Sequence, residues 1–548
     1  MKPNIFIPLM LCMILGAAHL STGNTYYVSP SGNNANPGSF SQPFLTVQFA
    51  ANAAAAGDTV FIRAGTYSEQ VTVTIGGNAF DGHVVFSAYQ NETVIMDGTG
   101  VGTGNNGFII QVSYVKLLNV SVRNWASTCI WVQGPEGFIE ISGCRVFNTA
   151  GCISFTNGVH DFVLNNNEMY NFLSYGFDCT SSTGQPDSYN GVFNDCYSHD
   201  GDSTQNCDGF AFGHTIHRNI VFNKCTAARV YDGFDLTGHG ITLNECLAFD
   251  CGNGAYKLWS DSIYLNNCIG HSSLISNVEL DGDLTSNPIY NPKTIIFRNC
   301  TFYDAGSYNI LVFNPNWGDS IKVYNCIIAG GDNIGINFED VTFATYKGDY
   351  NVFQNDNPGR VFANPLTDIT VADMQSGAWT ALTGQDANST TVTGSSVIFV
   401  DTLLPDLYLV AGAPAIDSGT PAWATAIDFD GCPRPFNVLY DIGAYEYPPC
   451  GIGIEELLHG AGNIFLLHNF PNPFSDATSI SFSLAEKTQV TLSIYDRLGK
   501  LLITPVSQIL PAGEHQYHLS TPGMEAGIYY ARLSTKHYSG FIKMVVIP

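Results

Sequence analysis

The chain has 548 residues, too many for one ordinary globular core, so we expect several domains or a solenoid. Charged residues make up only 12%, whereas 55 glycines and 12% aromatic residues indicate a β-rich protein with many turns. A net charge of −26 repels nucleic acid and anionic membranes, so we expect neither as a partner.

The first residues predict export. Lys2 precedes an apolar run from Ile5 to Ala18, and small and polar residues follow as far as Asn24. This order is typical of a signal peptide, which we place at residues 1–23. The run is too short for a spanning helix and no later stretch is long enough, so we expect no transmembrane segment.

Residues 24–448 are predicted to form a parallel β-helix. Its opening holds a short amphipathic stretch around Val47–Ala56, and a helix there would cover the unpaired edges at the end of a solenoid. Beyond it one apolar–polar alternating phrase recurs every 21 to 32 residues, the period of a solenoid with a half-buried strand in each turn. The copies are VKLLNV (115–120), IEISGC (139–144), FVLNNN (162–167), GVFNDC (191–196), IVFNKC (220–225), ITLNEC (241–246), IYLNNC (263–268), IIFRNC (295–300) and IKVYNC (321–326).

A second strand phrase follows most copies of the first, and a third, less regular one completes a three-faced coil. Equivalent residues of successive coils then stack about 4.8 Å apart. The stacked cysteines are predicted to be small buried apolar residues, and the stacked asparagines to bond backbone and neighbours; both are scaffold rather than metal ligands. The cysteines are Cys144, Cys196, Cys225, Cys246, Cys268, Cys300 and Cys326, and the asparagines are Asn194, Asn223, Asn244 and Asn266. Outside the repeat, Cys432 and Cys450 are a plausible disulfide.

Charge gathers in the outward column of the second phrase, which contains Asp178, Ala211, Asp235, Lys257 and Glu279. Asp208 and Asp232 enter the same strand, and the loop before Asp208 adds Asp200, Asp202 and Asn206. Carboxylates stacked this closely repel one another and need a counter-ion. Hard oxygen ligands suit Ca²⁺, whereas no tetrahedral set of imidazoles and thiolates indicates zinc. The alternative is a structural calcium ion that only stabilises the stacked coils.

The segments NCDGFAF (206–212), VYDGFDL (230–236) and GAYKLWS (254–260) resemble the family 9 polysaccharide lyases, calcium-dependent pectate lyases with a right-handed parallel β-helix. The resemblance covers about residues 25–350. It implies that Asp208, Asp232 and Asp235 hold Ca²⁺ and that Lys257 is the catalytic base. Asp202, from the loop before Asp208, is a further predicted ligand because the acids of that loop are spaced for an oxygen cage. The first Asp of the family's paired acids is Tyr231 here, which removes one expected ligand.

The implied reaction is β-elimination in a pectate-type acidic polysaccharide. Neutral Lys257 would take the proton at C5 of a uronate whose carboxylate is neutralised by Ca²⁺. Arg218, Lys224 and Arg229 are candidates to bring positive charge to the groove, and Trp259 to stack on a sugar ring. Two other hypotheses stay open: a non-catalytic cell-surface β-helix for glycan binding or adhesion, and a glycoside hydrolase using two of Asp178, Asp208, Asp232 and Asp235. We expect a monomer.

The end of the chain has a different composition. Segments 407–419 and 428–447 resemble the part that closes bacterial β-helices, and residues 449–464 are predicted to be a linker. Residues 465–548 have about seven short strand patterns, the motif PNPF and the basic final strand KMVVIP. They resemble the type A sorting domain of the type IX secretion system, a small β-sandwich. The resemblance implies export through that machinery to the cell surface or the medium.

Overall fold

The computed structural model describes residues 23–546 apart from gaps, so all but the last residue of the predicted signal peptide lies outside this range. The gaps are residues 91, 103–104, 183, 260–261, 281–293, 314–319, 332–333, 340–342, 356–358, 403–405, 437, 450–463, 471–473, 475–476, 485–486, 497–500, 512, 521–526 and 536–538. The chain divides into two compact units, residues 1–446 and 447–548. None of the described helices is long and apolar enough to cross a membrane.

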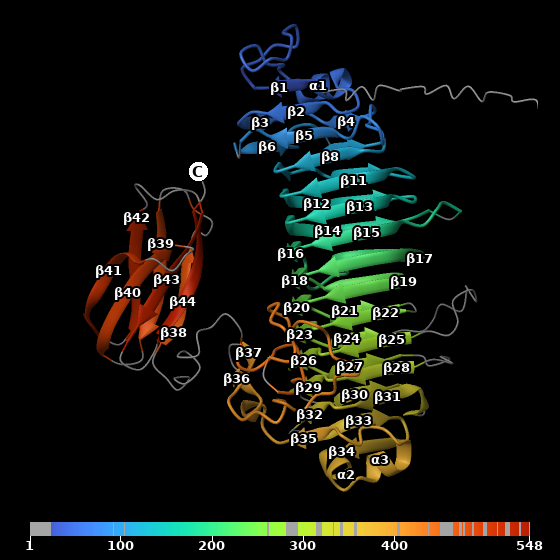
Figure 1. Cartoon of the computed structure of the whole chain (residues 1–548). Coiled ribbons are helices and arrows are strands. Elements are labelled where there is room, and N and C mark those ends of the chain that lie inside the picture. Colours follow the sequence, from blue (N-terminus) through green and yellow to red (C-terminus); the bar gives the residue numbers. More distant parts are fainter. Residues whose placement is uncertain are drawn as a thin grey trace, which may run out of the picture. The chain divides into compact units, whose positions relative to one another are not determined.

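The first unit is a parallel β-helix of three sheets, which confirms the predicted fold class (Figure 1). The first sheet, which carries the predicted site, pairs parallel strands from successive coils. Its strands, some of which bend into a second sheet, are β4 (Val71–Val73), β7 (Phe108–Ile110), β10 (Thr128–Gln133), β12 (Arg145–Thr156), β14 (Glu168–Thr180), β17 (Asp208–Asn223), β19 (Phe234–Asn244), β21 (Gly254–Leu258), β24 (Ser276–Leu280), β27 (Tyr308–Val312), β30 (Ile334–Phe338) and β33 (Arg360–Asn364).

The second sheet contains the repeated phrases, and the third completes each coil. The second sheet shares β17 and β19 and adds β1 (Thr25–Val28), β2 (Thr59–Ile62), β5 (Val84–Ala88), β8 (Val115–Leu118), β11 (Gly137–Ser142), β13 (His160–Asn165), β15 (Tyr189–Asn194), β22 (Ile263–Asn266), β25 (Thr294–Arg298), β28 (Ser320–Tyr324) and β31 (Tyr346–Asp349). The third shares β12 and β14 and adds β3 (Gly65–Tyr67), β6 (Val94–Asp97), β9 (Ser121–Arg123), β16 (Tyr197–His199), β18 (Thr226–Ala228), β20 (Leu247–Phe249), β23 (Ile269–His271), β26 (Thr301–Tyr303), β29 (Ile327–Ala329), β32 (Val352–Gln354) and β35 (Thr390–Val392).

The repeated Asn–X–Cys ending forms the corner between the second and third sheets. Asn194 ends β15, Asp195 adopts a left-handed conformation with φ 52°, and Cys196 turns inward and is buried. A single left-handed residue bends the chain sharply, and polar residues such as Asn and Asp tolerate that conformation. The outward asparagines hydrogen-bond from coil to coil, with Nδ2–Oδ1 distances of 2.8 to 2.9 Å between Asn165, Asn194, Asn223, Asn244 and Asn266. The predicted cysteine and asparagine ladders are therefore confirmed.

The twelve cysteines described as free are all buried, seven of them in the predicted ladder. Burial raises the pKa of the Cys144 thiol to about 12, so it is neither ionised nor accessible at neutral pH. We expect fewer than about one thiol per native chain to react with a thiol reagent. The same titration in guanidinium should expose these twelve, and fast reaction of several thiols in the native protein would contradict the buried ladder.

Both ends of the β-helix are covered. At the first end α1 (Val47–Ala53) forms as predicted, with Thr46 capping its N-terminus. At the other end, after the antiparallel strand β34 (Thr367–Thr370), lie α2 (Val371–Gln375) and α3 (Ala378–Thr383). The α3 residue Trp379 is buried and stacks on Phe362, with ring centroids 4.1 Å apart.

Segments 407–419 and 428–447, predicted to close the solenoid, lie instead along its side. Corner asparagines hold this part of the chain: Asn267, Asn299 and Asn325 donate to the carbonyl oxygens of Ile427, Asp441 and Thr420 at 2.8 to 3.0 Å. The pair β36 (Phe399–Asp401) and β37 (Asp406–Leu409) precedes it, and η1 (Phe343–Thr345) and η2 (Ser395–Val397) are single 3₁₀ turns. Cys432 is buried and disulfide-bonded, whereas Cys450, its predicted partner, lies outside the described residues.

The second unit has seven strands in two antiparallel sheets, in agreement with the predicted small β-sandwich. One sheet contains β38 (Ile464–Phe470), β39 (Ala477–Leu484) and β42 (Gly513–Ser520). The other contains β40 (Thr488–Asp496), β41 (Leu501–Leu510), β43 (Gly527–Ser534) and β44 (Ser539–Val546). Apolar residues of both sheets, among them Ile480 and Leu533, share one buried core. Most of the predicted linker 449–464 lies outside the described residues.

Candidate functional site

The charged column lies on the outer face of the first sheet. The strand register pairs Asp178 with Ala211, Ala211 with Asp235, Asp235 with Lys257, and Lys257 with Glu279. This is the predicted order, because side chains at one strand position in a β-helix stack from coil to coil.

Three carboxylates meet beside this column. Oxygens of Asp208, Asp232 and Asp235 all lie within 4.8 Å of one another, and Asp208 and Asp232 are buried. Asp208 begins β17, whereas Asp232 lies in the turn before β19, so the two come from successive coils. Three acids from two neighbouring coils therefore meet at one point on the edge of the first sheet.

Hydrogen bonds fix two of these carboxylates and leave one oxygen unsatisfied. Asp232 Oδ1 accepts from Asn253 Nδ2 at 2.8 Å and from Gly254 N at 2.9 Å. Asp235 Oδ1 accepts from Trp259 Nε1 at 2.7 Å. Asp208 Oδ1 is buried without a hydrogen-bond partner among the described residues. A buried oxygen of this kind is costly unless a ligand satisfies it.

The electrostatics of the group call for a cation. Burial, together with the neighbouring charges of Asp235 and Asp232, raises the pKa of Asp208 to about 8. Burial likewise raises the pKa of Asp235 to about 6, although Lys257 opposes that rise. The three acids therefore cannot all ionise cheaply near neutral pH without added positive charge.

Lys257 supplies part of that charge. Its Nζ lies 3.2 Å from Asp232 Oδ2 and 3.7 Å from Asp235 Oδ2, and its side chain is 15% exposed. Burial lowers the pKa of Lys257, but the charges of Asp232, Asp235 and Glu279 outweigh burial and raise it above its ordinary value. In this arrangement Lys257 is an ammonium ion shared between two carboxylates.

Trp259 contacts both Asp235 and Lys257. Its indole N–H donates to Asp235, and its ring centroid lies 5.1 Å from Lys257 Nζ, within cation–π range. The predicted role of Trp259 was sugar stacking; here its contacts are with the acid and the lysine.

Replacing Trp259 by phenylalanine keeps an aromatic ring and removes the N–H that orients Asp235. If Asp235 is a metal ligand, we expect calcium affinity to fall about tenfold, the effect of losing an outer partner of a ligand. Isothermal titration calorimetry with Ca²⁺ measures this directly. Unchanged affinity would show that Asp235 keeps its orientation without Trp259.

The other predicted site residues lie elsewhere. Asp202 is not among the three converging acids; its Oδ1 accepts from the Thr204 hydroxyl at 2.7 Å. Arg218 is exposed in the second-sheet part of β17, 5.8 Å from the ring of Tyr189. Arg229 is a left-handed corner residue, φ 53°, ion-paired with Asp200. Lys224 is another corner residue, also with φ 53°. The structure does not bring these four to the acidic group.

One neighbouring residue, Asn253, was not predicted, whereas Tyr231 was predicted to offer no ligand. Asn253 follows Asp232 by one coil and orients it, a position visible in the sequence only as the residue before Gly254. Tyr231, where the lyase pattern has an acid, packs its partly buried side chain against the core. That position therefore supports the fold here and offers no ligand.

The donor set fits calcium. It consists of carboxylate oxygens, one of them buried and unsatisfied, and hard oxygen ligands are what Ca²⁺ takes in proteins. Among the described residues no other group of three or more His, Cys, Asp or Glu side chains converges in this way.

Residues 26–264 match the family described as Pel9A-like, right handed beta helix region, and residues 468–547 match the secretion system C-terminal sorting domain. Pectate lyase L of Paenibacillus polymyxa is 26% identical over 333 residues, covering 56% of this chain and 68% of that protein. Pectate lyase PEL9 of Emericella nidulans is 38% identical over 74 residues, 13% of this chain and 18% of that protein. The crystal structure of pectate lyase Pel9A matches 78% of this chain and 98% of its own, with a TM-score of 0.48 and 17% identity.

Proposed function

We propose that this chain, whose residues 26–264 are a Pel9A-like right-handed β-helix region, is a secreted calcium-dependent lyase of pectate or a related polyuronate. The observation that carries the proposal is the group Asp208, Asp232 and Asp235, which faces Lys257 on one sheet. The relationship to proteins named pectate lyases supports the reaction class.

The C-terminal sorting domain directs the protein by type IX secretion to the cell surface or the extracellular space. Polyuronates outside the cell are therefore within its reach. The low content of basic residues agrees with a substrate bound through a cation rather than through many direct ion pairs.

In the proposed reaction Lys257 Nζ takes the proton from C5 of a uronate unit. The electrons of the C5–H bond form the C4–C5 double bond, the C4–O bond breaks, and the leaving oxygen is protonated from solvent. Calcium held by Asp208, Asp232 and Asp235 would neutralise the uronate carboxylate and so make C5 more acidic. General-base catalysis by a positioned side chain contributes about 10²- to 10⁴-fold.

Lys257 can act as a base only as the neutral amine, so its ammonium must first lose a proton to solvent. The charges of Asp232 and Asp235 raise the pKa of Lys257, so another cation must neutralise these carboxylates when the site is active. Asn253, Gly254 and Trp259 keep these carboxylates oriented while that exchange occurs.

The products test the reaction class. Mass spectrometry of oligomers released from polygalacturonate should find new non-reducing ends lighter by one water than hydrolysis products. Products carrying the full water would instead support the glycoside hydrolase hypothesis. The close approach of the three acids disfavours inverting hydrolysis, in which the paired carboxyl groups lie about 6.5–9.5 Å apart.

A further inference from the structure

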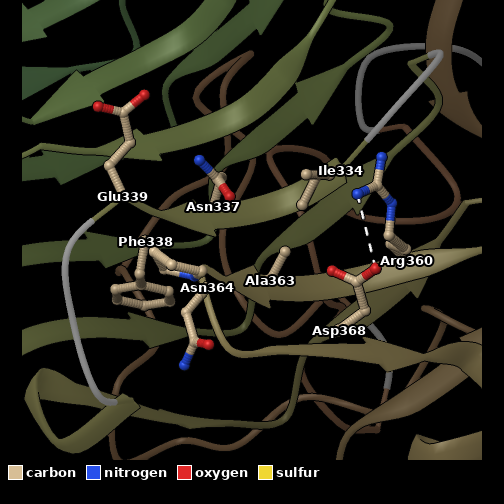
Figure 2. A pocket seen from close by; sticks show the side chains of 9 residues that line it. Ile334, Asn337, Phe338, Glu339, Arg360, Ala363, Asn364 and Asp368 are labelled. Atoms are coloured by element: carbon tan, nitrogen blue, oxygen red, sulfur yellow. Dashed lines mark ion pairs between the residues drawn. The ribbon is translucent and has the colours of Figure 1, made fainter.

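A polar pocket lies on the first sheet, nearer the C-terminal end of the β-helix than the acidic group. It encloses about 290 Å³ between β30, β33 and β34 (Figure 2). Its lining residues include Asn337, Glu339, Arg360, Asn364 and Asp368.

The pocket shares its sheet face with the acidic site. The outward column continues from Lys257 through Glu279 and Leu311 to Asn337 and Ala363. At about 4.8 Å a coil, Asn337 lies about 14 Å and Ala363 about 19 Å beyond Lys257. Leu311 is buried between them, so the two sites are separate points on one face.

Arg360 is the cationic side chain that lines this pocket. The Arg63, Arg145 and Arg229 side chains all hydrogen-bond to carboxylates. Arg360, by contrast, makes no side-chain hydrogen bond with the described residues: its Nη1 lies 3.7 Å from Asp368 Oδ2, and its Nε is buried without a partner. A guanidinium has five donors, so nearly all of its hydrogen-bonding capacity is unused.

We propose that this pocket binds the carboxylate of a uronate unit several sugars away from the one at Lys257. The inference rests on the proposed function, since it assumes an acidic polysaccharide on this face. The ligand carboxylate would replace Asp368 as the partner of Arg360, exchanging a long ion pair for a bidentate one. Asp368 is half exposed and can turn to water, and the Asn337 amide faces the same pocket.

The length of the oligosaccharide substrate provides the test. In Arg360→Gln the KM for polygalacturonate should rise about tenfold, a loss of about 1.4 kcal/mol. The KM for trigalacturonate, too short to reach from Lys257 to Arg360, should change less than about twofold. Asp368→Asn removes the competing carboxylate, so it should lower the KM for the polymer. Arg145→Gln, which deletes the same charge from the third sheet, should leave both values unchanged.

A binding measurement separates this inference from the lyase proposal. In calcium-free gels containing polygalacturonate, wild type should be retarded more than Arg360→Gln, whatever its catalytic activity. Equal mobility of these two proteins, or an equal rise of KM for polymer and trimer, would overturn the proposal that this pocket binds a uronate. Retardation without any lyase activity would instead reject the proposed reaction and keep the binding site.

Discussion

Replacing Lys257 by methionine should lower kcat on polygalacturonate by about 10³-fold, within the range expected for removing a general base. Methionine fills a similar volume and cannot accept a proton. Calcium binding should persist or tighten, because the Lys257 ammonium contacts the same oxygens of Asp232 and Asp235 that the ion would need. Initial rates and calorimetric titration with Ca²⁺ measure the two effects separately.

Lys116→Met is the matched control. Lys116 is ion-paired with Glu140 at 2.6 Å on the second sheet, so its loss should change neither rate nor calcium affinity. If the Lys257→Met protein is folded, binds calcium and keeps activity within about tenfold of wild type, Lys257 is not the catalytic base.

Replacing Asp232 by asparagine should weaken calcium binding by more than about 100-fold, the upper limit for loss of an outer partner alone. Asparagine preserves the shape and an acceptor for Asn253 and Gly254, but removes the most buried charge of the group. Wild type at a calcium concentration 100 times its Kd should gain about 2.7 kcal/mol in free energy of unfolding. The variant at the same calcium concentration should gain almost nothing.

Thermal unfolding with calcium and with chelator measures this difference. Glu140→Gln, a carboxylate substitution remote from the group, should keep the full calcium response. If Asp232→Asn also kept that response, the stabilising ion would bind somewhere other than the three converging acids. If calcium stabilised wild type but no uronate were cleaved, the group would be a structural calcium site without a catalytic role.

The sequence predicted the repeat and the charged column because a β-helix converts spacing along the chain into position in space. Once the Asn–X–Cys corners are aligned, each coil places its outward residue above the last, so Asp235 and Lys257 must be neighbours. The three-acid group followed from the same register, since Asp208 and Asp232 enter equivalent strands in successive coils.

Residues in corners and loops could not be placed in that way. Arg229 occupies a left-handed corner and Asp202 a turn of its own, so neither shares the column's periodicity. Arg218 follows a bend in the long strand β17, which carries it onto another sheet. The side-chain bonds of Trp259 and Asn253 depend on rotamers, which spacing alone does not determine.

We propose that Lys257 and the three acids perform calcium-dependent β-elimination. Ultraviolet absorbance during incubation with polygalacturonate tests it most directly, with wild type and Lys257→Met each assayed in calcium and in chelator. We expect absorbance to rise only for wild type in calcium, as the unsaturated product accumulates. No rise for wild type on any polyuronate, with the protein folded and calcium bound, would contradict the claim and leave the β-helix as a glycan-binding surface.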